Sequence, residues 1–359
     1  MNGKERINRV LRHEPVDRMP IYEHFWDDTK DMWVKQGHIQ PHERLEDHFG
    51  FDMQMDWTFD MMAKLDFEPE VLEETEDTIL TKDGNGAILR RHKLHTSTPE
   101  HVDYTVKCRE DWEREIKPYL LEVDERRIRF ESYRTVKASA DKAGRFFCWC
   151  GLHVFELMHA MCGHENLLIG MALDPDWVKD MVKVYSELLI KLQTRLFERE
   201  GYPDGIFYYE DMGYKHSPFF SFSMYKDIIQ QGHIDTINYA HEHGLPVIMH
   251  SCGFVEPLLP GMIESGIDCL QALEVKAGMD LVKLYRQYGD QIAFMGGIDV
   301  RCITSNDRQK IDAELEEKMP ALREKNGYMI HSDHSIPSSV EYDVFKYFID
   351  TSLKLGTFK

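Results

Sequence analysis

A histidine and a cysteine two residues apart form the most specific chemical motif of the sequence, His250-Ser251-Cys252-Gly253. Alternate residues of an extended strand point to the same side, so the His250 imidazole and the Cys252 thiol can approach one point. Zinc binds nitrogen and sulfur ligands, and a zinc site that performs chemistry uses three protein ligands with one position left open. The pair therefore predicts two ligands of a zinc site.

The third ligand has to come from the end of another strand. The late segment His331-Ser332-Asp333-His334 follows the last predicted strand, and we predict His334 as the ligand, with Asp333 and His331 as alternatives. The structural alternative is a hydrogen-bonded histidine beside a small buried cysteine, with no metal.

Carboxylates follow two other predicted strands. Glu210 and Asp211 come directly after an aromatic strand, and either can bind a substrate hydroxyl or transfer a proton. The alternative is that Glu210 forms an ion pair inside the fold while Asp211 caps the next segment. Asp299 follows Gly-Gly-Ile and is predicted to bind substrate, with a helix N-cap as its alternative.

Aromatic side chains near these positions indicate a pocket for a flat ligand. Glu23, His24 and Trp26 follow the first predicted strand, and Tyr208 and Tyr209 end the fourth. We predict that these five residues bind substrate, the rings by stacking. Packing in the core is the alternative for the same cluster.

Two further groups have the residue types of metal ligands. Cys148 and Cys150 share one strand face, but no histidine follows at ligand spacing, so we interpret them as packing residues. His153, Glu156 and His159 share one helix face, and a solvated face is favoured there over a metal site.

The elements that must position these residues alternate regularly in the second half of the chain. Helical apolar spacing and short apolar runs succeed one another, which predicts parallel strands joined by helices. With three strands from the first half, the fold class is α/β, a (β/α)₈ TIM barrel, with a doubly wound open sheet as the alternative. The predicted strands cover residues 19–23, 51–55, 146–150, 206–209, 245–250, 268–273, 292–295 and 328–331.

We expect one domain, residues 1–359, with a helical extension over about 1–18 and an inserted β-hairpin over about 71–104. The turn Asp83-Gly84-Asn85-Gly86 between two apolar runs is a hairpin signal. In a parallel barrel the active site lies at the carboxyl ends of the strands, where the predicted metal ligands and the predicted carboxylates are placed.

Composition excludes several classes of function. The formal net charge is -20, which opposes binding to nucleic acid. The sequence has no run of about 18 apolar residues and no signal-peptide pattern, so we expect a soluble, cytoplasmic protein that does not associate with membranes. Seven cysteines without a framework spacing fit free thiols.

Several short motifs together resemble the uroporphyrinogen decarboxylase-like superfamily. The likeness extends from the N-terminus to the last helix and implies a barrel fold with its site at the strand ends. The motifs are Lys4-Glu5-Arg6-Ile7, Glu14-Pro15-Val16-Asp17-Arg18, His250-Ser251-Cys252-Gly253, Gly296-Gly297-Ile298-Asp299 and His334-Ser335-Ile336-Pro337.

The resemblance favours the corrinoid-dependent methyltransferase branch of that superfamily. The decarboxylases hold a polycarboxylate with an arginine-rich segment after the first strand, whereas residues 20–26 here are acidic and aromatic. The methyltransferases bind zinc through H-x-C and a later cysteine, where this chain has His334. A less electron-rich site suits the removal of a methyl group from oxygen.

The resemblance thus implies an enzyme that moves a methyl group from a methoxylated, aromatic substrate to the Co(I) of a separate corrinoid protein, assisted by one zinc ion. A methylcobamide:thiol methyltransferase and a decarboxylase are the alternatives. The expected partners are the corrinoid protein and the small methoxylated substrate, and a homodimer is compatible with the sequence.

Overall fold

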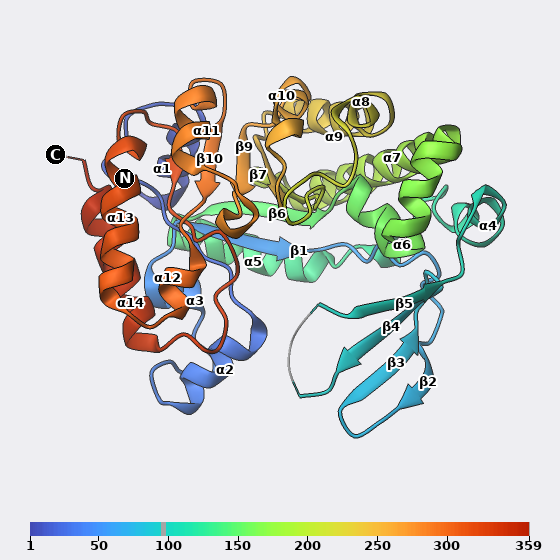
Figure 1. The fold of residues 1–359 in the computed structure, drawn as a ribbon, viewed down its shortest axis with the longest axis horizontal. Coiled ribbons are helices and arrows are strands. Elements are labelled where there is room, and N and C mark those ends of the chain that lie inside the picture. The colour runs from blue at the N-terminus through green and yellow to red at the C-terminus, as the bar shows by residue number, and fades with distance from the viewer. Residues whose placement is uncertain (95–97, 359) are drawn as a thin grey trace.

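The computed structural model describes residues 1–94 and 98–358. Seven parallel strands form the main sheet in the order β1-β6-β7-β8-β9-β10-β11 (Figure 1). Helices follow most of these strands, as the alternating sequence pattern predicts. The strands are β1 (Met53–Trp57), β6 (Phe146–Leu152), β7 (Gly205–Tyr209), β8 (Val247–Ser251), β9 (Cys269–Ala272), β10 (Ala293–Gly296) and β11 (Tyr328–Met329).

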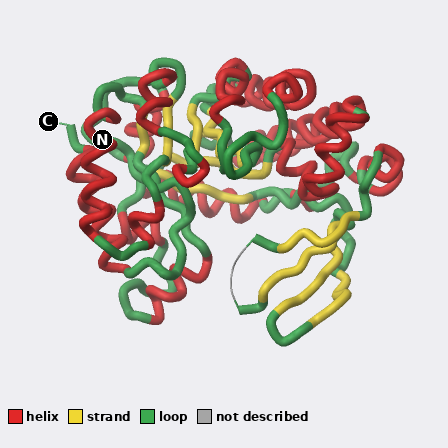
Figure 2. The backbone as a smooth tube through the Cα atoms, viewed as in Figure 1, coloured by secondary structure: helices red, strands yellow, loops and turns green. Residues whose placement is uncertain are grey.

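The helices lie around the parallel strands (Figure 2). Their apolar faces and the outward side chains of the strands form the larger hydrophobic cluster. The helices are α1 (Gly3–Leu11), α2 (Asp27–Lys35), α3 (Leu45–Phe49), α4 (Arg109–Glu115), α5 (Phe130–Ala143), α6 (Val154–Leu173), α7 (Pro175–Glu200), α8 (Phe222–Met224), α9 (Gln230–Glu242), α10 (Leu259–Glu264), α11 (Leu281–Tyr288), α12 (Val300–Thr304), α13 (Arg308–Leu322) and α14 (Tyr342–Gly356).

The predicted first strand, residues 19–23, is not a regular strand. The Ile330 amide donates to the Pro20 carbonyl at 2.8 Å, and the Asp52 amide donates to the Ile21 carbonyl at 3.0 Å. Residues 20–22 therefore lie between the two edge strands, with one bridge from Ile21 to Ile330 next to β11 and one hydrogen bond to Asp52 next to β1. The parallel α/β architecture is confirmed, whereas the regular strands form a seven-stranded sheet.

The N-terminal charged motif fixes this segment. The Asp52 carboxylate accepts from the Arg6 guanidinium at 2.5 Å and from the Arg18 guanidinium at 2.7 Å, and the Ile21 amide donates to it at 2.8 Å. Asp52 is buried, and these hydrogen bonds compensate the cost of desolvating its charge. The motif thus has a structural role, which is to hold residues 18–21 against the start of β1.

The insertion is larger than the single hairpin predicted for residues 71–104. It is a four-stranded antiparallel sheet of β2 (Glu70–Glu74), β3 (Thr78–Lys82), β4 (Ala87–His92) and β5 (Glu100–Tyr104). Residues 95–97 of the predicted segment lie outside the described residues. The expected turn at Asp83–Gly86 joins β3 and β4, and the sheet stands apart from the parallel strands, below α6 in Figure 1.

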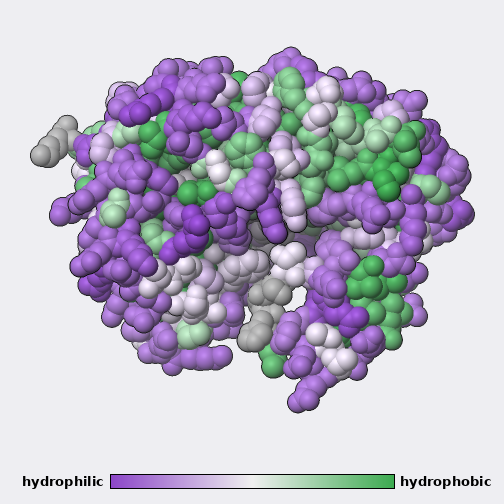
Figure 3. Space-filling view, viewed as in Figure 1, coloured by the Kyte–Doolittle hydropathy of each residue, from purple (hydrophilic) through white to green (hydrophobic). Residues whose placement is uncertain are grey.

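The surface facing the viewer in Figure 3 is mostly hydrophilic, and it is hollowed between the antiparallel sheet and the rest of the molecule. In the described part of the chain, no helix is long and apolar enough to cross a membrane.

Candidate metal centre and adjoining pocket

Three potential ligands from neighbouring strands converge at the carboxyl end of the parallel sheet. His250 belongs to β8, Cys252 follows β8, and Asp211 follows β7, which pairs with β8. The His250 Nε2 atom lies 3.2 Å from the Cys252 Sγ atom and 3.3 Å from an Asp211 carboxylate oxygen. The ligand atoms of all three residues lie within 4.8 Å of one another.

The hydrogen bonds of His250 and Asp211 orient them toward this point. The His250 Nδ1 atom contacts the Gln271 side-chain oxygen on β9, so Nδ1 carries the proton and Nε2 faces Cys252 and Asp211. The Cys252 amide donates to the Asp211 carboxylate at 2.7 Å. A partner that fixes the second ring nitrogen is a regular feature of histidines that bind metals.

The electrostatics of the three residues favour a cation. Burial lowers the pKa of His250, but Cys252 and Asp211 together outweigh that effect and raise this pKa well above its ordinary value. Burial raises the pKa of Asp211, yet the nearby His250 reverses the effect and lowers it. Burial also raises the pKa of the Cys252 thiol, so the Asp211 carboxylate is the group that stabilises a positive charge beside His250.

Two glycines lock the loops that carry Asp211 and Cys252. A Cβ atom on Gly213 would lie 2.3 Å from the Cys252 carbonyl oxygen, and one on Gly253 would lie 2.4 Å from the Gly213 carbonyl carbon. The Phe254 amide also donates to the Tyr214 carbonyl at 2.9 Å. The two backbones therefore touch, and only glycine fits at both positions.

His334, the predicted third ligand, is not part of this cluster. Its ring lies 6.1 Å from the Trp26 ring, and the carbonyl of His334 accepts from the Ser332 hydroxyl at 2.7 Å. Asp333 accepts the amides of Val275 and Val300, both at 2.8 Å. The physical reason is strand order: β11 is three places from β8, whereas β7 is its neighbour.

Glu210, predicted as a proton carrier, lies on the opposite side of the strand from Asp211. It is fully buried and accepts the Phe155 amide at 3.0 Å and the Glu156 amide at 3.2 Å, at the N-terminus of α6. His233 donates to it at 2.7 Å. A carboxylate that caps a helix and pairs with a histidine has a structural role, and the ion-pair alternative describes it better.

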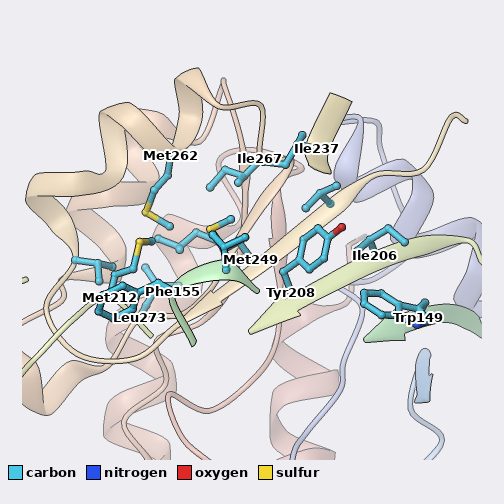
Figure 4. Close-up of a cluster of buried hydrophobic side chains, with 14 of the residues drawn as sticks. Trp149, Phe155, Ile206, Tyr208, Met212, Ile237, Met249, Met262, Ile267 and Leu273 are labelled. Carbon is cyan, nitrogen blue, oxygen red and sulfur yellow. The ribbon is translucent and has the colours of Figure 1, made fainter. Parts of the chain in front are cut away.

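Two predicted substrate residues also lie away from the cluster. Tyr208 is buried in the layer between sheet and helices shown in Figure 4, where its ring stacks on His153 at 4.0 Å. Outward-facing positions of a strand alternate with inward-facing ones, which separates Tyr208 from Tyr209. Asp299 caps α12 by accepting the Arg301 amide at 2.9 Å, as its N-cap alternative states.

Tyr209, His24 and His331 form a chain of hydrogen bonds beside the cluster. The His331 Nδ1 atom contacts the Ser332 carbonyl, which can only accept, so His331 Nε2 accepts from His24 Nδ1 at 2.7 Å. His24 Nε2 then accepts from the Tyr209 hydroxyl at 2.8 Å. The Ser332 carbonyl fixes the proton on His331, and the protons on His24 and Tyr209 follow from it. These hydrogen bonds hold the Tyr209 ring 4.8 Å from the His250 ring.

Glu23 and Trp26 lie at the edge of this network. Glu23 is buried and accepts the Ser332 amide at 2.6 Å, so it supports the last strand end rather than a ligand. Trp26 is half-buried and lines a cavity of about 400 Å³ together with His24.

The neutral buried histidines predict a loss of stability in acid. Burial lowers the pKa of His331 from 6.5 to about 3 and lowers that of His24 as well. The unfolded chain therefore binds more protons below pH 6.5, and the free energy of unfolding falls as the pH drops from about 6.5 toward 3, by up to about 1.4 kcal/mol per pH unit for each histidine. Urea denaturation at about pH 7.5 and about pH 5.5 measures this fall.

The variant His331→Gln is expected to reduce that fall. His241→Gln is the control, because the hydrogen bond that His241 donates to the Asp268 carboxylate raises the pKa of His241, so its removal makes the fall slightly steeper. An equal fall in the wild type and in His331→Gln would contradict the prediction.

A second cavity, of about 490 Å³, lies beyond Tyr209 on the side of Trp57. The Trp57 ring lines it and lies 4.7 Å from the Tyr209 ring, which in turn contacts His250. Gly151, Leu152 and residues of α6 and of the antiparallel sheet complete its wall. The sequence pattern did not indicate this cavity, because its walls come from segments far apart in the chain.

Comparison with known proteins identifies the family. The uroporphyrinogen decarboxylase (URO-D) family model matches residues 130–354, which is more than half of the chain. The chain belongs to the uroporphyrinogen decarboxylase family. The matched range contains Asp211, His250 and Cys252, and it confirms the family resemblance of the sequence motifs.

One solved structure supports the same fold over the whole chain. A methyltransferase from Methanosarcina mazei is similar at 15% sequence identity and a TM-score of 0.69, with 98% of each chain covered. A Xaa-Pro dipeptidase with bound methionine is much less similar, at 13% identity and a TM-score of 0.33 over 63% of this chain and 59% of that one. Among curated proteins, none matches this chain significantly.

Proposed function

We propose that this member of the uroporphyrinogen decarboxylase family is a methyltransferase that moves a methyl group from a methoxylated aromatic compound to a corrinoid protein. The observation that carries the proposal is the convergence of Asp211, His250 and Cys252 at the carboxyl end of the sheet. The fold shared with a methanogen methyltransferase supports it.

The three side chains fit a zinc ion. Carboxylate oxygen, imidazole nitrogen and thiolate sulfur are all zinc ligands, and three protein ligands leave one position for a substrate. Zinc bound there would act as a Lewis acid on the ether oxygen of the methyl donor. Asp211 takes the place that we predicted for His334, and one carboxylate in place of a second thiolate keeps the site less electron-rich.

The residues of this chain prepare the carbon–oxygen bond for cleavage. The bond between methyl carbon and ether oxygen breaks with its electron pair left on the oxygen, and Co(I) of the partner protein takes the methyl group. The phenolate that leaves would be stabilised by a zinc ion held by Asp211, His250 and Cys252. The Tyr209 ring packs against His250 on one side and against the Trp57 ring on the other.

The proposed architecture is a (β/α)₈ barrel in which residues 20–22 take the eighth strand position, supported by their bonds to both edge strands. Transfer of methyl to a thiol is the alternative reaction for a zinc site. Decarboxylation of a polycarboxylate has less support, because residues 20–26 contain no arginine.

The experiment is to mix the zinc-loaded protein with a reduced corrinoid protein and a panel of methyl donors, and to follow the spectral change from Co(I) to methyl-Co(III). We expect methylation from aryl methyl ethers. Methylation from thioethers alone, or release of CO₂ from porphyrinogens, would contradict the proposal.

A further inference from the structure

The side chain of His250 is held from both neighbouring strands of the parallel sheet. Tyr209 on β7 and Gln271 on β9 are its partners in the strand register. The Tyr209 ring lies 4.8 Å from the His250 ring, and the Gln271 side-chain oxygen contacts His250 Nδ1. The orientation of the imidazole is therefore fixed on two sides, and its Nε2 atom faces Asp211 and Cys252.

Gln271 is a buried and uncharged partner for the second ring nitrogen. The residue is 1% exposed, and its amide oxygen accepts from the Nδ1–H of His250 without carrying a charge. A carboxylate in the same place would make a histidine ligand more basic. The amide therefore fixes the tautomer of His250 and adds no negative charge to the cluster.

The carboxylates of the neighbouring loops have other partners. Glu274, three residues after Gln271, accepts the Gly253 amide at 2.7 Å and forms an ion pair with Lys276 at 3.0 Å. Asp211 accepts the Cys252 amide and lies on the Nε2 side of His250. Within residues 1–94 and 98–358, the acceptor at His250 Nδ1 is thus the Gln271 amide.

The neutral amide affects the charge that a bound ion would retain. The Asp211 carboxylate and the Cys252 thiolate bring two negative charges, which equal the charge of a zinc ion, and His250 binds as a neutral imidazole. A third negative charge next to Nδ1 would offset part of the charge of the ion, and burial strengthens that effect. A more basic histidine binds zinc more tightly and leaves it a weaker Lewis acid.

We infer that Gln271 is a positioning residue that makes the proposed zinc ion more reactive, and less tightly bound, than a carboxylate partner of His250 would. It directs His250 Nε2 toward the ion site. Because it is an amide, it keeps the ion electron-poor, as cleavage of an ether bond requires. The inference rests on the proposed function for the identity of the ion and of the reaction.

The first test measures the zinc affinity of the full chain by competition with a coloured chelator. Gln271→Met keeps the approximate size of the side chain and removes the acceptor, so we expect it to weaken zinc binding by about ten- to one-hundredfold. Gln271→Glu keeps the shape and adds the charge, so we expect it to tighten zinc binding by about tenfold. A merely structural role of Gln271 would shift both affinities in the same direction.

The second test measures methyl transfer from an aryl methyl ether to Co(I), with every variant saturated with zinc. We expect Gln271→Glu to be at least about tenfold slower than the wild type, although it binds zinc more tightly. Gln271→Met is expected to stay within about threefold of the wild-type rate, because the ion keeps its charge once it is bound.

Gln193→Met is the matched control. Gln193 on α7 is also fully buried, and its amide donates to the Tyr208 hydroxyl at 3.0 Å, away from the cluster. We expect its zinc affinity and its rate to stay within about twofold of the wild type, and urea denaturation verifies that each variant is folded. Weaker zinc binding by both Gln271 variants, a wild-type affinity of Gln271→Glu, or an equal effect of Gln193→Met would overturn the inference.

The two proposals can fail separately. Opposite shifts in the zinc affinity of the two Gln271 variants, without methyl transfer from any aryl methyl ether, would refute the proposed function and leave the role of Gln271. Methyl transfer by the wild type, with zinc affinity unchanged in both variants, would refute the role of Gln271 and leave the function. A wild-type chain that binds no zinc would overturn both.

Discussion

Cys252→Ala is expected to remove bound zinc and to lower the rate of methyl transfer by about a thousandfold. Cys252 provides the single sulfur ligand of the cluster, and two remaining ligands are too few for a stable zinc site. Lewis-acid stabilisation of the departing oxygen is worth several kcal/mol, and each 1.4 kcal/mol is about tenfold in rate. Metal analysis of the purified protein and the Co(I) spectral assay measure the two effects.

His334→Ala is the matched control for this variant. The sequence motif predicts His334 as a ligand, whereas its ring lies beside Trp26. We expect it to keep a full complement of zinc, and Asp211→Asn to lose most of it. Retention of zinc by Cys252→Ala would remove the chemical basis of the proposed function, and loss of zinc from His334→Ala would restore the original ligand set.

Glu210→Ala is expected to lower the free energy of unfolding by roughly 3–5 kcal/mol. The substitution leaves the Phe155 amide, the Glu156 amide and the His233 ring without their acceptor in a fully buried position. Urea denaturation near neutral pH measures the loss, since the slope of the transition reports whether the same surface is exposed.

The neighbouring Asp211→Asn variant separates stability from chemistry. Asp211 is partly exposed, and asparagine can still accept the Cys252 amide, so we expect a change in stability below about 1 kcal/mol together with the loss of zinc. If Glu210→Ala were stable and inactive, the prediction of Glu210 as a proton carrier would regain its support.

The sequence alone was sufficient for the elements that are regular and local. Alternating helical and apolar patterns located β6 to β11 within a few residues, because buried parallel strands are short apolar runs between amphipathic helices. The conformation of residues 19–23 was harder to predict. Their hydrogen bonds to Ile330 and Asp52 join distant parts of the chain, and no periodic sequence pattern indicates them. The central turn of the insertion was predicted from its sequence. The strands β2 and β5 were not, because they are exposed and contain no apolar run.

Those candidate ligands that lie close together in the sequence could be predicted. His250 and Cys252 are two residues apart, and the structure keeps them together. The third member depends on which strand lies beside β8, and consecutive strands of a parallel α/β sheet are commonly neighbours. That rule would have selected Asp211 over His334. Gln271 shares no motif with His250, so only the register of β8 and β9 shows that the two residues are in contact.

The close contact of Gly213 with the Cys252–Gly253 backbone bears on how the chain would bind the proposed ion. Small zinc domains order their ligands only when the metal arrives, so the metal drives their folding. Here the main-chain contact at Gly213 and Gly253, together with the hydrogen bond from the Cys252 amide to Asp211, already holds the two loops side by side. The proposed zinc ion would therefore enter loops that are already in place, and its uptake would not drive folding.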